Sequence, residues 1–223
     1  MPRKLAMVHT VARLMPVYDQ LSLELMPEVE RIHIADEILL RLVLTAGGMT
    51  PAIYRRFTED AVWAEQVGAQ VVLLTCSSIS PAVDVAQPMV GVPVLKIDQP
   101  MADRAVSLGR RIGVVATAMV TLKPTSELIA ARAQLAGKQV QVETVFCEGA
   151  HPLMLAGQME RHDEIVLGYL RRAMQDYDVV VLAQGSMARV AEQIPEAERR
   201  VPILSSPRLG MEYARDVIMQ LPA

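Results

Sequence analysis

The sequence feature that most limits the possible folds is an internal repeat. Three segments recur in the same order at almost one offset: residues 5–10 with 112–117, 71–78 with 179–186, and 92–95 with 201–204, at offsets of 107, 108 and 109. Three ordered matches at nearly one offset rarely arise by chance, so we expect two similar halves. The alternative is a single doubly wound sheet whose buried strands merely resemble one another.

Short runs of Val, Ile and Leu alternate with helical patterns along the chain. Runs without polar alternation are typical of parallel strands that are covered on both faces. Strands are expected at residues 5–8, 71–74, 92–95, 112–115, 140–145, 179–182 and 201–204. The clearest helices are expected at residues 52–67, 124–135, 164–175 and 209–219. This alternation predicts an α/β fold of two Rossmann-like halves, each built on a parallel sheet.

The predicted halves also indicate where a ligand would bind. We place the first half at residues 1–97 and the second at residues 98–207, and we expect a C-terminal helix at residues 208–223 to pack with the first. Ligands of such sheets bind beyond the carboxyl ends of the strands. The residues that follow the paired strands are Thr10, Cys76, Thr117 and Gln184. We therefore expect these four residues to line a small-molecule site in a cleft between the halves.

Composition and charge argue against several classes of function. The 223 residues are 52% hydrophobic and 21% charged with a net charge of −3, which indicates a globular chain without a basic field for nucleic acid or anionic lipid. Two cysteines make neither a disulfide framework nor a zinc-binding pair. The N-terminal segment lacks the apolar run of a signal peptide, and no window reaches the ~18 apolar residues of a membrane span. We expect a cytoplasmic protein that binds neither nucleic acid nor membranes and forms a homo-oligomer.

Cys76 is the strongest candidate for a reactive group. It lies at a predicted strand end and is flanked by Thr75, Ser77 and Ser78. A cysteine just before a helix has its thiolate favoured, which makes it a better nucleophile or base. The alternative is a buried cysteine that packs as a small apolar side chain. Cys147 also follows a strand, but it has no counterpart in the first half and is a weaker candidate.

Histidines and hydroxyl residues give further candidates. His9 could transfer protons near neutral pH, although such a histidine is more often a hydrogen-bonded structural group. The pair His162–Asp163 resembles a solvated helix start, and no histidine has ligand spacing to cysteines or carboxylates, so we expect no metal site. The hydroxyls that could donate to a substrate carboxylate are Ser77, Ser78, Thr117, Thr121 and Ser186. Their alternative role is helix capping.

The sequence resembles the aspartate/glutamate racemase superfamily, which includes hydantoin racemases, maleate isomerases and arylmalonate decarboxylases. The resemblance covers nearly the whole chain, from residue 7 to residue 207. Its most specific segments are Leu-Thr-Cys-Ser-Ser at 74–78, Ile-Gly-Val-Val-Ala-Thr at 112–117 with Thr121, and Leu-Ala-Gln-Gly-Ser-Met at 182–187.

The resemblance implies a pseudosymmetric α/β enzyme without a cofactor. Racemases of this type use two opposed cysteines, one in each half, to remove and return a proton. The first cysteine matches Cys76, whereas the second position is occupied by Gln184. Because an amide cannot act as a general acid or base at neutral pH, the two-thiol mechanism is in doubt. One-cysteine members include decarboxylases, and nucleophilic chemistry of the maleate isomerase type also stays open.

We therefore expect an isomerase that needs no cofactor and acts next to the carboxylate of a small acid, with Cys76 as proton donor or nucleophile. Gln184 would hydrogen-bond the substrate. The expected carboxylate-binding residues are Thr10, Ser77, Ser78, Thr117, Thr121, Gly185 and Ser186. The alternatives are a one-cysteine decarboxylase or lyase, a cysteine hydrolase that uses His9 as its base, and a carboxylate-binding protein without turnover.

Overall fold

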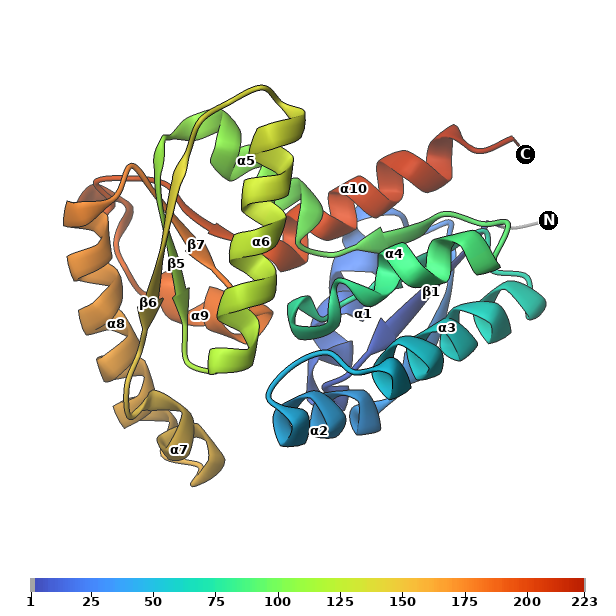
Figure 1. Ribbon diagram of the computed structural model, residues 1–223, viewed down its shortest axis with the longest axis horizontal. Helices are drawn as coiled ribbons and strands as arrows, with labels where there is room; N and C mark the ends of the chain where they lie inside the picture. Colours follow the sequence, from blue (N-terminus) through green and yellow to red (C-terminus); the bar gives the residue numbers. More distant parts are fainter. Residues whose placement is uncertain (1–2, 223) are drawn as a thin grey trace. The chain divides into compact units, whose positions relative to one another are not determined.

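The computed structural model describes residues 3–222. The chain divides into two compact units, which consist of residues 1–99 with 207–223 and residues 100–206. The predicted boundary after residue 97 lies two residues before this division. Each unit contains a four-stranded parallel sheet with helices on its faces (Figure 1).

The sheet of the first unit has the strand order β2-β1-β3-β4. Its strands are β1 (Lys4–His9), β2 (Glu30–Ala35), β3 (Val71–Leu74) and β4 (Val94–Lys96). The helices that accompany them are η1 (Ala12–Leu14), α1 (Met15–Leu25), α2 (Glu37–Ala46), α3 (Pro51–Gln66), η2 (Ser77–Ile79), α4 (Ala82–Ala86), η3 (Gln87–Met89) and α10 (Ser206–Gln220).

The sheet of the second unit repeats this order as β6-β5-β7-β8. Its strands are β5 (Arg111–Ala116), β6 (Gln141–Phe146), β7 (Val179–Leu182) and β8 (Ile203–Ser205). Its helices are α5 (Gln99–Leu108), α6 (Met119–Leu135), α7 (Ala150–Leu155), α8 (Met159–Asp176), η4 (Gly185–Met187), α9 (Ala188–Ala191) and η5 (Glu196–Glu198). Helices α6 and α8 run along opposite faces of β5 (Figure 1).

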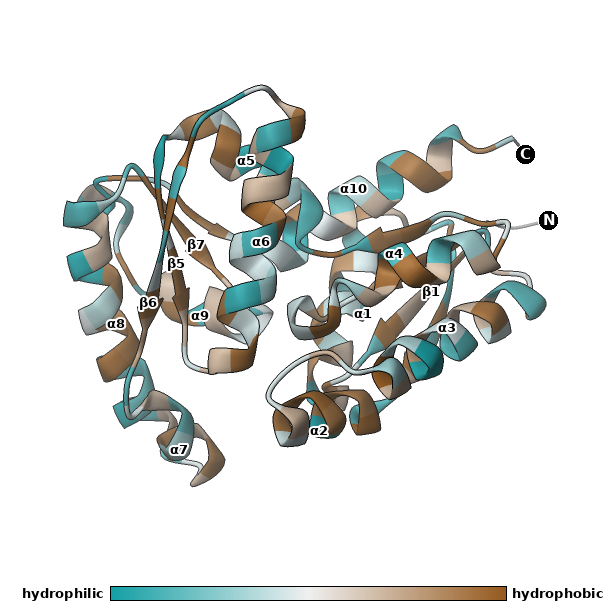
Figure 2. Cartoon of the chain, in the orientation of Figure 1, coloured by the Kyte–Doolittle hydropathy of each residue, from teal (hydrophilic) through white to brown (hydrophobic). Residues whose placement is uncertain are grey.

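The central strands are covered on both faces, as their composition predicts. In the first unit, Ala6 and Val8 of β1 pack into one cluster with α2, α3 and α4, while Leu5 and Met7 pack into another with α1 and α10. The strands therefore appear mainly brown in the hydropathy colouring, between helices of mixed colour (Figure 2). Each central strand contributes four consecutive buried apolar residues to the core of its unit.

The structure also contains elements that the sequence patterns did not reveal. Strand β2 has the sequence Glu-Arg-Ile-His-Ile-Ala and is only partly buried, because it forms an edge of its sheet. Helix α6 begins at Met119, five residues before the predicted start, and it contains Pro124. The sequence pattern predicts a helix that begins at Pro124. In the structure this proline lies inside the helix, where it removes one intrahelical hydrogen bond.

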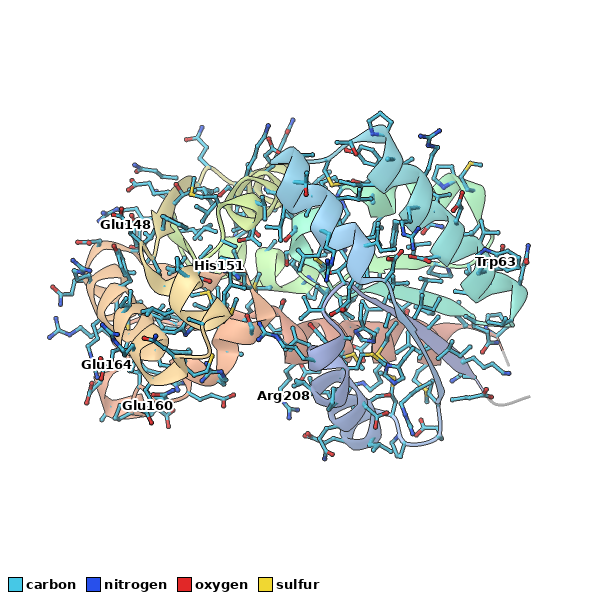
Figure 3. The ribbon with its side chains drawn as sticks, turned by 90° about the horizontal axis from the view of Figure 1, so that it is seen from below. Trp63, Glu148, His151, Glu160, Glu164 and Arg208 are labelled. Carbon is cyan, nitrogen blue, oxygen red and sulfur yellow. The ribbon has the colours of Figure 1, made fainter. Side chains whose placement is uncertain are left out.

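No helix within residues 3–222 is both long and apolar enough to cross a membrane. Large apolar side chains are nevertheless exposed at several places. One of them is Trp63 of α3, which is 64% exposed and lies at the surface of its unit (Figure 3).

Candidate active site

Cys76 lies just beyond the carboxyl end of β3, where the chain turns into the short helix η2. It is the N-cap residue of this helix and has the extended dihedral angles φ −132° and ψ 111°. Its side chain is partly exposed, whereas Cys147 is fully buried. Burial also raises the pKa of the Cys147 thiol to about 12. Of the two thiols, only Cys76 is accessible to a ligand.

The surroundings of Cys76 favour its protonated form. Burial raises the pKa of the thiol above its ordinary value. Hydrogen bonding from the Thr10 hydroxyl, from Ser78 and from the backbone N–H of Ile79 lowers the pKa but offsets burial only in part. The prediction that the thiolate is favoured is therefore wrong for this structure, because desolvation outweighs the helix start. At neutral pH, Cys76 is a thiol with a proton to give.

Thr10 and Ser78 both lie within hydrogen-bonding reach of Cys76. Thr10 follows β1 and is 2% exposed. Within the described part of the chain, no nitrogen or oxygen atom is hydrogen-bonded to Thr10 Oγ1. Its hydroxyl instead lies beside the Cys76 sulfur, a weak acceptor from which a ligand oxygen could take over the hydrogen bond. Thr10 Oγ1 is thus a group beside the thiol that can still bind a ligand oxygen.

The residue before Cys76 is held firmly by its neighbours. The N–H and the hydroxyl of Thr75 each lie 3.1 Å from the carbonyl oxygen of Val8, and the hydroxyl lies 3.0 Å from Nδ1 of His9. The Tyr18 hydroxyl donates to the Thr75 carbonyl oxygen at 3.4 Å. Burial, Cys76 and Asp98 raise the pKa of Tyr18, so its phenol stays protonated as a donor.

Sequence reasoning missed Asp98, a fully buried carboxyl group on the other side of the Cys76 loop. The Ser80 hydroxyl donates to Asp98 Oδ1 at 2.8 Å, and the Ser77 hydroxyl also favours the charged carboxylate. Burial nevertheless raises the pKa of Asp98. Asp98 lies just past β4, so the strand-end rule, applied to the fourth strand as well, would have found it.

Gln184 occupies the position in the second unit that corresponds to Cys76. It is the N-cap residue of η4 with φ −131° and ψ 126°, nearly the backbone angles of Cys76. Its Oε1 accepts three hydrogen bonds, from Thr117 N at 2.7 Å, Thr117 Oγ1 at 3.1 Å and Ala118 N at 3.1 Å. Because two of these donors are backbone N–H groups, the oxygen and not the nitrogen of the amide must face them.

These contacts change the roles that we predicted for two threonines. The N–H and hydroxyl of Thr117 both donate to Gln184, and the Thr121 hydroxyl donates to the carbonyl oxygen of Ala118 at 2.7 Å. Their hydrogens are already used, so neither residue is set to donate to a carboxylate. The remaining donors at this strand edge are the amide nitrogen of Gln184 and the partly exposed Gly185 and Ser186.

An ion pair between the buried Asp163 and the partly exposed Arg189 fixes the segment that follows Gln184. Arg189 of α9 donates to both carboxylate oxygens of Asp163 at 2.6 and 2.8 Å, and His162 Nδ1 lies 2.7 Å from Asp163 Oδ1. His162 and Asp163 are 3% and 9% exposed, so the expectation of a solvated helix start is wrong. The ion pair between Asp163 and Arg189 thus joins α8 to α9.

Three glutamates of the second unit lie at its surface, and one of them, Glu148, follows the carboxyl end of β6. Glu148, Glu160 and Glu164 are exposed (Figure 3). Within residues 3–222, no group of three or more His, Cys, Asp or Glu side chains is arranged to hold a metal ion. The prediction that the two strand edges line one cleft stays a prediction.

The family model for Asp/Glu/hydantoin racemases matches residues 49–214. The chain belongs to this family. A glutamate racemase from Gloeobacter violaceus is 33% identical over 118 residues, which are 52% of this chain and 43% of that protein. The match thus spans less than half the length of this curated relative.

Solved structures of proteins described as racemases or racemase homologues have the same fold. An aspartate racemase homologue from Pyrococcus horikoshii is 14% identical with a TM-score of 0.71, covering 99% of this chain and all of that one. An allantoin racemase from Klebsiella pneumoniae is 15% identical with a TM-score of 0.70, over 97% and 88% of the two chains. A glutamate racemase isoform from Bacillus anthracis is 15% identical with a TM-score of 0.71, over 97% and 82%. These likenesses and the two matching sheets confirm the predicted α/β fold.

Proposed function

We propose that this protein is an isomerase that needs no cofactor and moves a proton at the carbon next to the carboxylate of a small acid, with Cys76 as the reacting group. The observation that carries the proposal is a partly exposed cysteine whose sulfur lies beside the Thr10 hydroxyl at one strand edge. Membership of the racemase family supports the same reaction class.

In this reaction the thiol and the planar enolate of the substrate exchange one proton. The Cys76 thiol first loses its proton to solvent, and the thiolate then removes the proton bound to carbon while the electron pair moves into the carboxylate as an enolate. Isomerisation requires that a solvent proton reaches the opposite face of the enolate, because return of the Cys76 proton to the same face regenerates the substrate. The Thr10 hydroxyl and the N–H of Ser78 would bind the oxygen on which negative charge develops. Because burial raises the pKa of Cys76, forming the thiolate is costly, but the thiolate once formed is a stronger base toward the proton bound to carbon.

Gln184 favours a second candidate, a decarboxylase that protonates one face only. Its Oε1 is fully used by Thr117 and Ala118, and an amide has no proton to exchange at neutral pH. In a decarboxylation, the carbon–carbon bond to the departing carboxylate breaks and CO₂ leaves. The resulting carbanion then takes the Cys76 proton, and solvent restores the thiol. This reaction needs a single thiol.

A hydrolase with an acyl-cysteine intermediate receives less support. It would need His9 as a base beside Cys76. The two ring nitrogens of His9 instead lie 3.0 Å from Thr75 Oγ1 and 3.0 Å from His33 Nδ1. With both nitrogens occupied, His9 has no free position from which to accept the thiol proton.

The test is to incubate the protein in deuterated water with a panel of small acids. The panel contains dicarboxylates, amino acids, a hydantoin and an arylmalonate, and deuterium at carbon, optical rotation and CO₂ are followed. The isomerase proposal predicts deuterium in the recovered substrate or its isomer, and the decarboxylase candidate predicts CO₂ with one product enantiomer. The Cys76→Ala variant should lose either activity, and Cys147→Ser should keep it. Turnover by Cys76→Ala at the wild-type rate would exclude Cys76 as the reacting group.

A further inference from the structure

Asp19, His33 and His9 of the first unit form a series of polar contacts that ends at Thr75. Thr75 Oγ1 lies 3.0 Å from His9 Nδ1, and His9 Nε2 lies 3.0 Å from His33 Nδ1. His33 Nε2 in turn lies 3.5 Å from Asp19 Oδ1. The members come from β1, β2 and α1, so folding of the unit brings them together.

This series of contacts runs from the surface to the buried end of β3. The side chain of Asp19 is 44% exposed, that of His33 is 19% exposed, and His9 is 1% exposed as a residue. The two imidazole rings are stacked, with centroids 5.2 Å apart and an interplanar angle of 21°. Tyr18 packs on the other side of His9 at 5.4 Å. Packing of this kind holds both rings in one orientation.

The charge of Asp19 sets the direction of the hydrogen bonds. Asp19 Oδ1 accepts a hydrogen bond from Arg31 Nε at 2.9 Å and attracts the Nε2–H of His33 at the longer distance of 3.5 Å. With that hydrogen on Nε2, Nδ1 of His33 accepts from His9 Nε2–H. Nδ1 of His9 is then an acceptor, and the hydroxyl hydrogen of Thr75 is shared between this nitrogen and the carbonyl oxygen of Val8. Burial and the nearby His33 lower the pKa of His9 to about 4, so this imidazole is neutral at pH 7, as the order requires.

We propose that His9, His33 and Asp19 are positioning residues that act through Thr75 to hold Cys76 at the end of β3. The proposal rests on the proposed function in one respect, since it takes Cys76 as the reactive thiol. Thr75 is joined to Cys76 by a peptide bond, and its N–H, hydroxyl and carbonyl are all engaged. Removing these contacts leaves the Thr75 hydroxyl with the Val8 carbonyl oxygen as its only partner and loosens the turn that keeps the thiol partly buried.

The experiment measures how fast iodoacetamide alkylates Cys76 between pH 6 and pH 10, by mass spectrometry of the modified peptide. The variants are His9→Phe, His33→Phe and Asp19→Asn, of which the first two keep the ring stack. Each should lower the apparent pKa of Cys76, since the thiol gains solvent. A decrease of about half a pKa unit gives roughly threefold faster alkylation at pH 7.5. Asp216→Asn is the matched control, because Asp216 is also an exposed acid bound to an arginine.

A double-variant cycle distinguishes positioning from general loosening. If His9 acts through Thr75, the double variant with Thr75→Val and His9→Phe should change the alkylation profile no more than the single variant with the larger effect. Additive effects, or profiles that equal that of the wild type, would overturn the proposal. Should His9→Phe fail to fold, His33→Phe and Asp19→Asn carry the same test from the surface end, with thermal unfolding followed for each.

The outcome can be separated from that of the proposed function. Alkylation needs no substrate, so coupling between His33 and Cys76 is measured whether or not turnover is found. Turnover that survives Cys76→Ala would refute the proposed chemistry and leave the coupling result unaffected. An unchanged alkylation profile would refute the positioning role, even where Cys76 proves essential for turnover.

Discussion

At the scale of single residues, Cys76 and Cys147 differ in burial, and this decides their reactivity. Cys76 is partly exposed at a strand end, whereas Cys147 is fully buried and has its pKa raised to about 12. Because the thiolate is the nucleophile, we expect iodoacetamide at pH 8 to modify Cys76 in the folded protein and to spare Cys147. Peptide mass spectrometry measures both sites in one sample. Equal modification of the folded protein would contradict the burial difference.

Gln184 is the second residue with a measurable local role. Gln184→Leu leaves two backbone N–H groups and the Thr117 hydroxyl without their acceptor. We expect the free energy of unfolding to fall by about 2 kcal/mol, since unpaired buried donors cost about 1–3 kcal/mol. Gln184→Glu keeps an oxygen at the same place and should lose less. Urea unfolding measures both, and Gln134→Leu on the exposed face of α6 is the control.

At the scale of elements, two carboxyl groups on neighbouring helices have opposite effects on stability. Asp36 is the N-cap of α2, where it accepts from Ile38 N at 3.0 Å, and it pairs with Arg56 of α3. Burial and the nearby Asp36 raise the pKa of Asp60 on α3 to about 7. The native state thus keeps this proton to about pH 7, while the unfolded chain loses it near the ordinary value of 3.8. The favourable contribution of Asp60 to the free energy of unfolding is therefore complete below pH 3.8, and it is lost as the pH rises to about 7.

From this sign we predict that Asp60→Asn stabilises the protein at pH 8. The gain should be about 1–2 kcal/mol in the free energy of unfolding, allowing for the partial solvent exposure of the group, and should vanish near pH 4. Asp36→Asn should destabilise at pH 8, because it removes the charge that Arg56 binds. Urea unfolding at the two pH values gives both results. A loss of stability in Asp60→Asn at pH 8 would show that the raised pKa is wrong.

At the scale of the whole molecule, the C-terminal helix α10 belongs to the first unit although it follows the second in sequence. Its residues Met211, Ala214 and Ile218 are fully buried in the cluster that also contains Leu5 and Leu73. Gly210 allows this close approach. A Cβ atom there would lie 2.3 Å from the Ile97 side chain and 2.5 Å from its carbonyl oxygen. The first unit therefore depends on both ends of the chain.

Two glycine substitutions in helices should consequently have opposite effects on the stability of the protein. Gly210→Ala should destabilise the protein by about 1–3 kcal/mol, because α10 must shift away from Ile97. Gly168→Ala in α8 meets nothing within 4 Å and should stabilise by about 0.5–1 kcal/mol through helix propensity. Thermal unfolding compares the two variants directly. A neutral Gly210→Ala would mean that α10 is packed more loosely than described.

The sequence by itself determined the fold class, the repeat and the strand ends at which Cys76 and Gln184 lie. These follow from local patterns, because runs of four buried apolar residues and their fixed offset are visible without any contact. It did not reveal β2, whose charged residues suit an edge. The tertiary structure alone decided that Gln184 binds a turn 67 residues away and that His9 meets Thr75 across 66 residues. It also decided that burial keeps Cys76 protonated, since desolvation and such pairings depend on strand register and on the neighbours that packing provides.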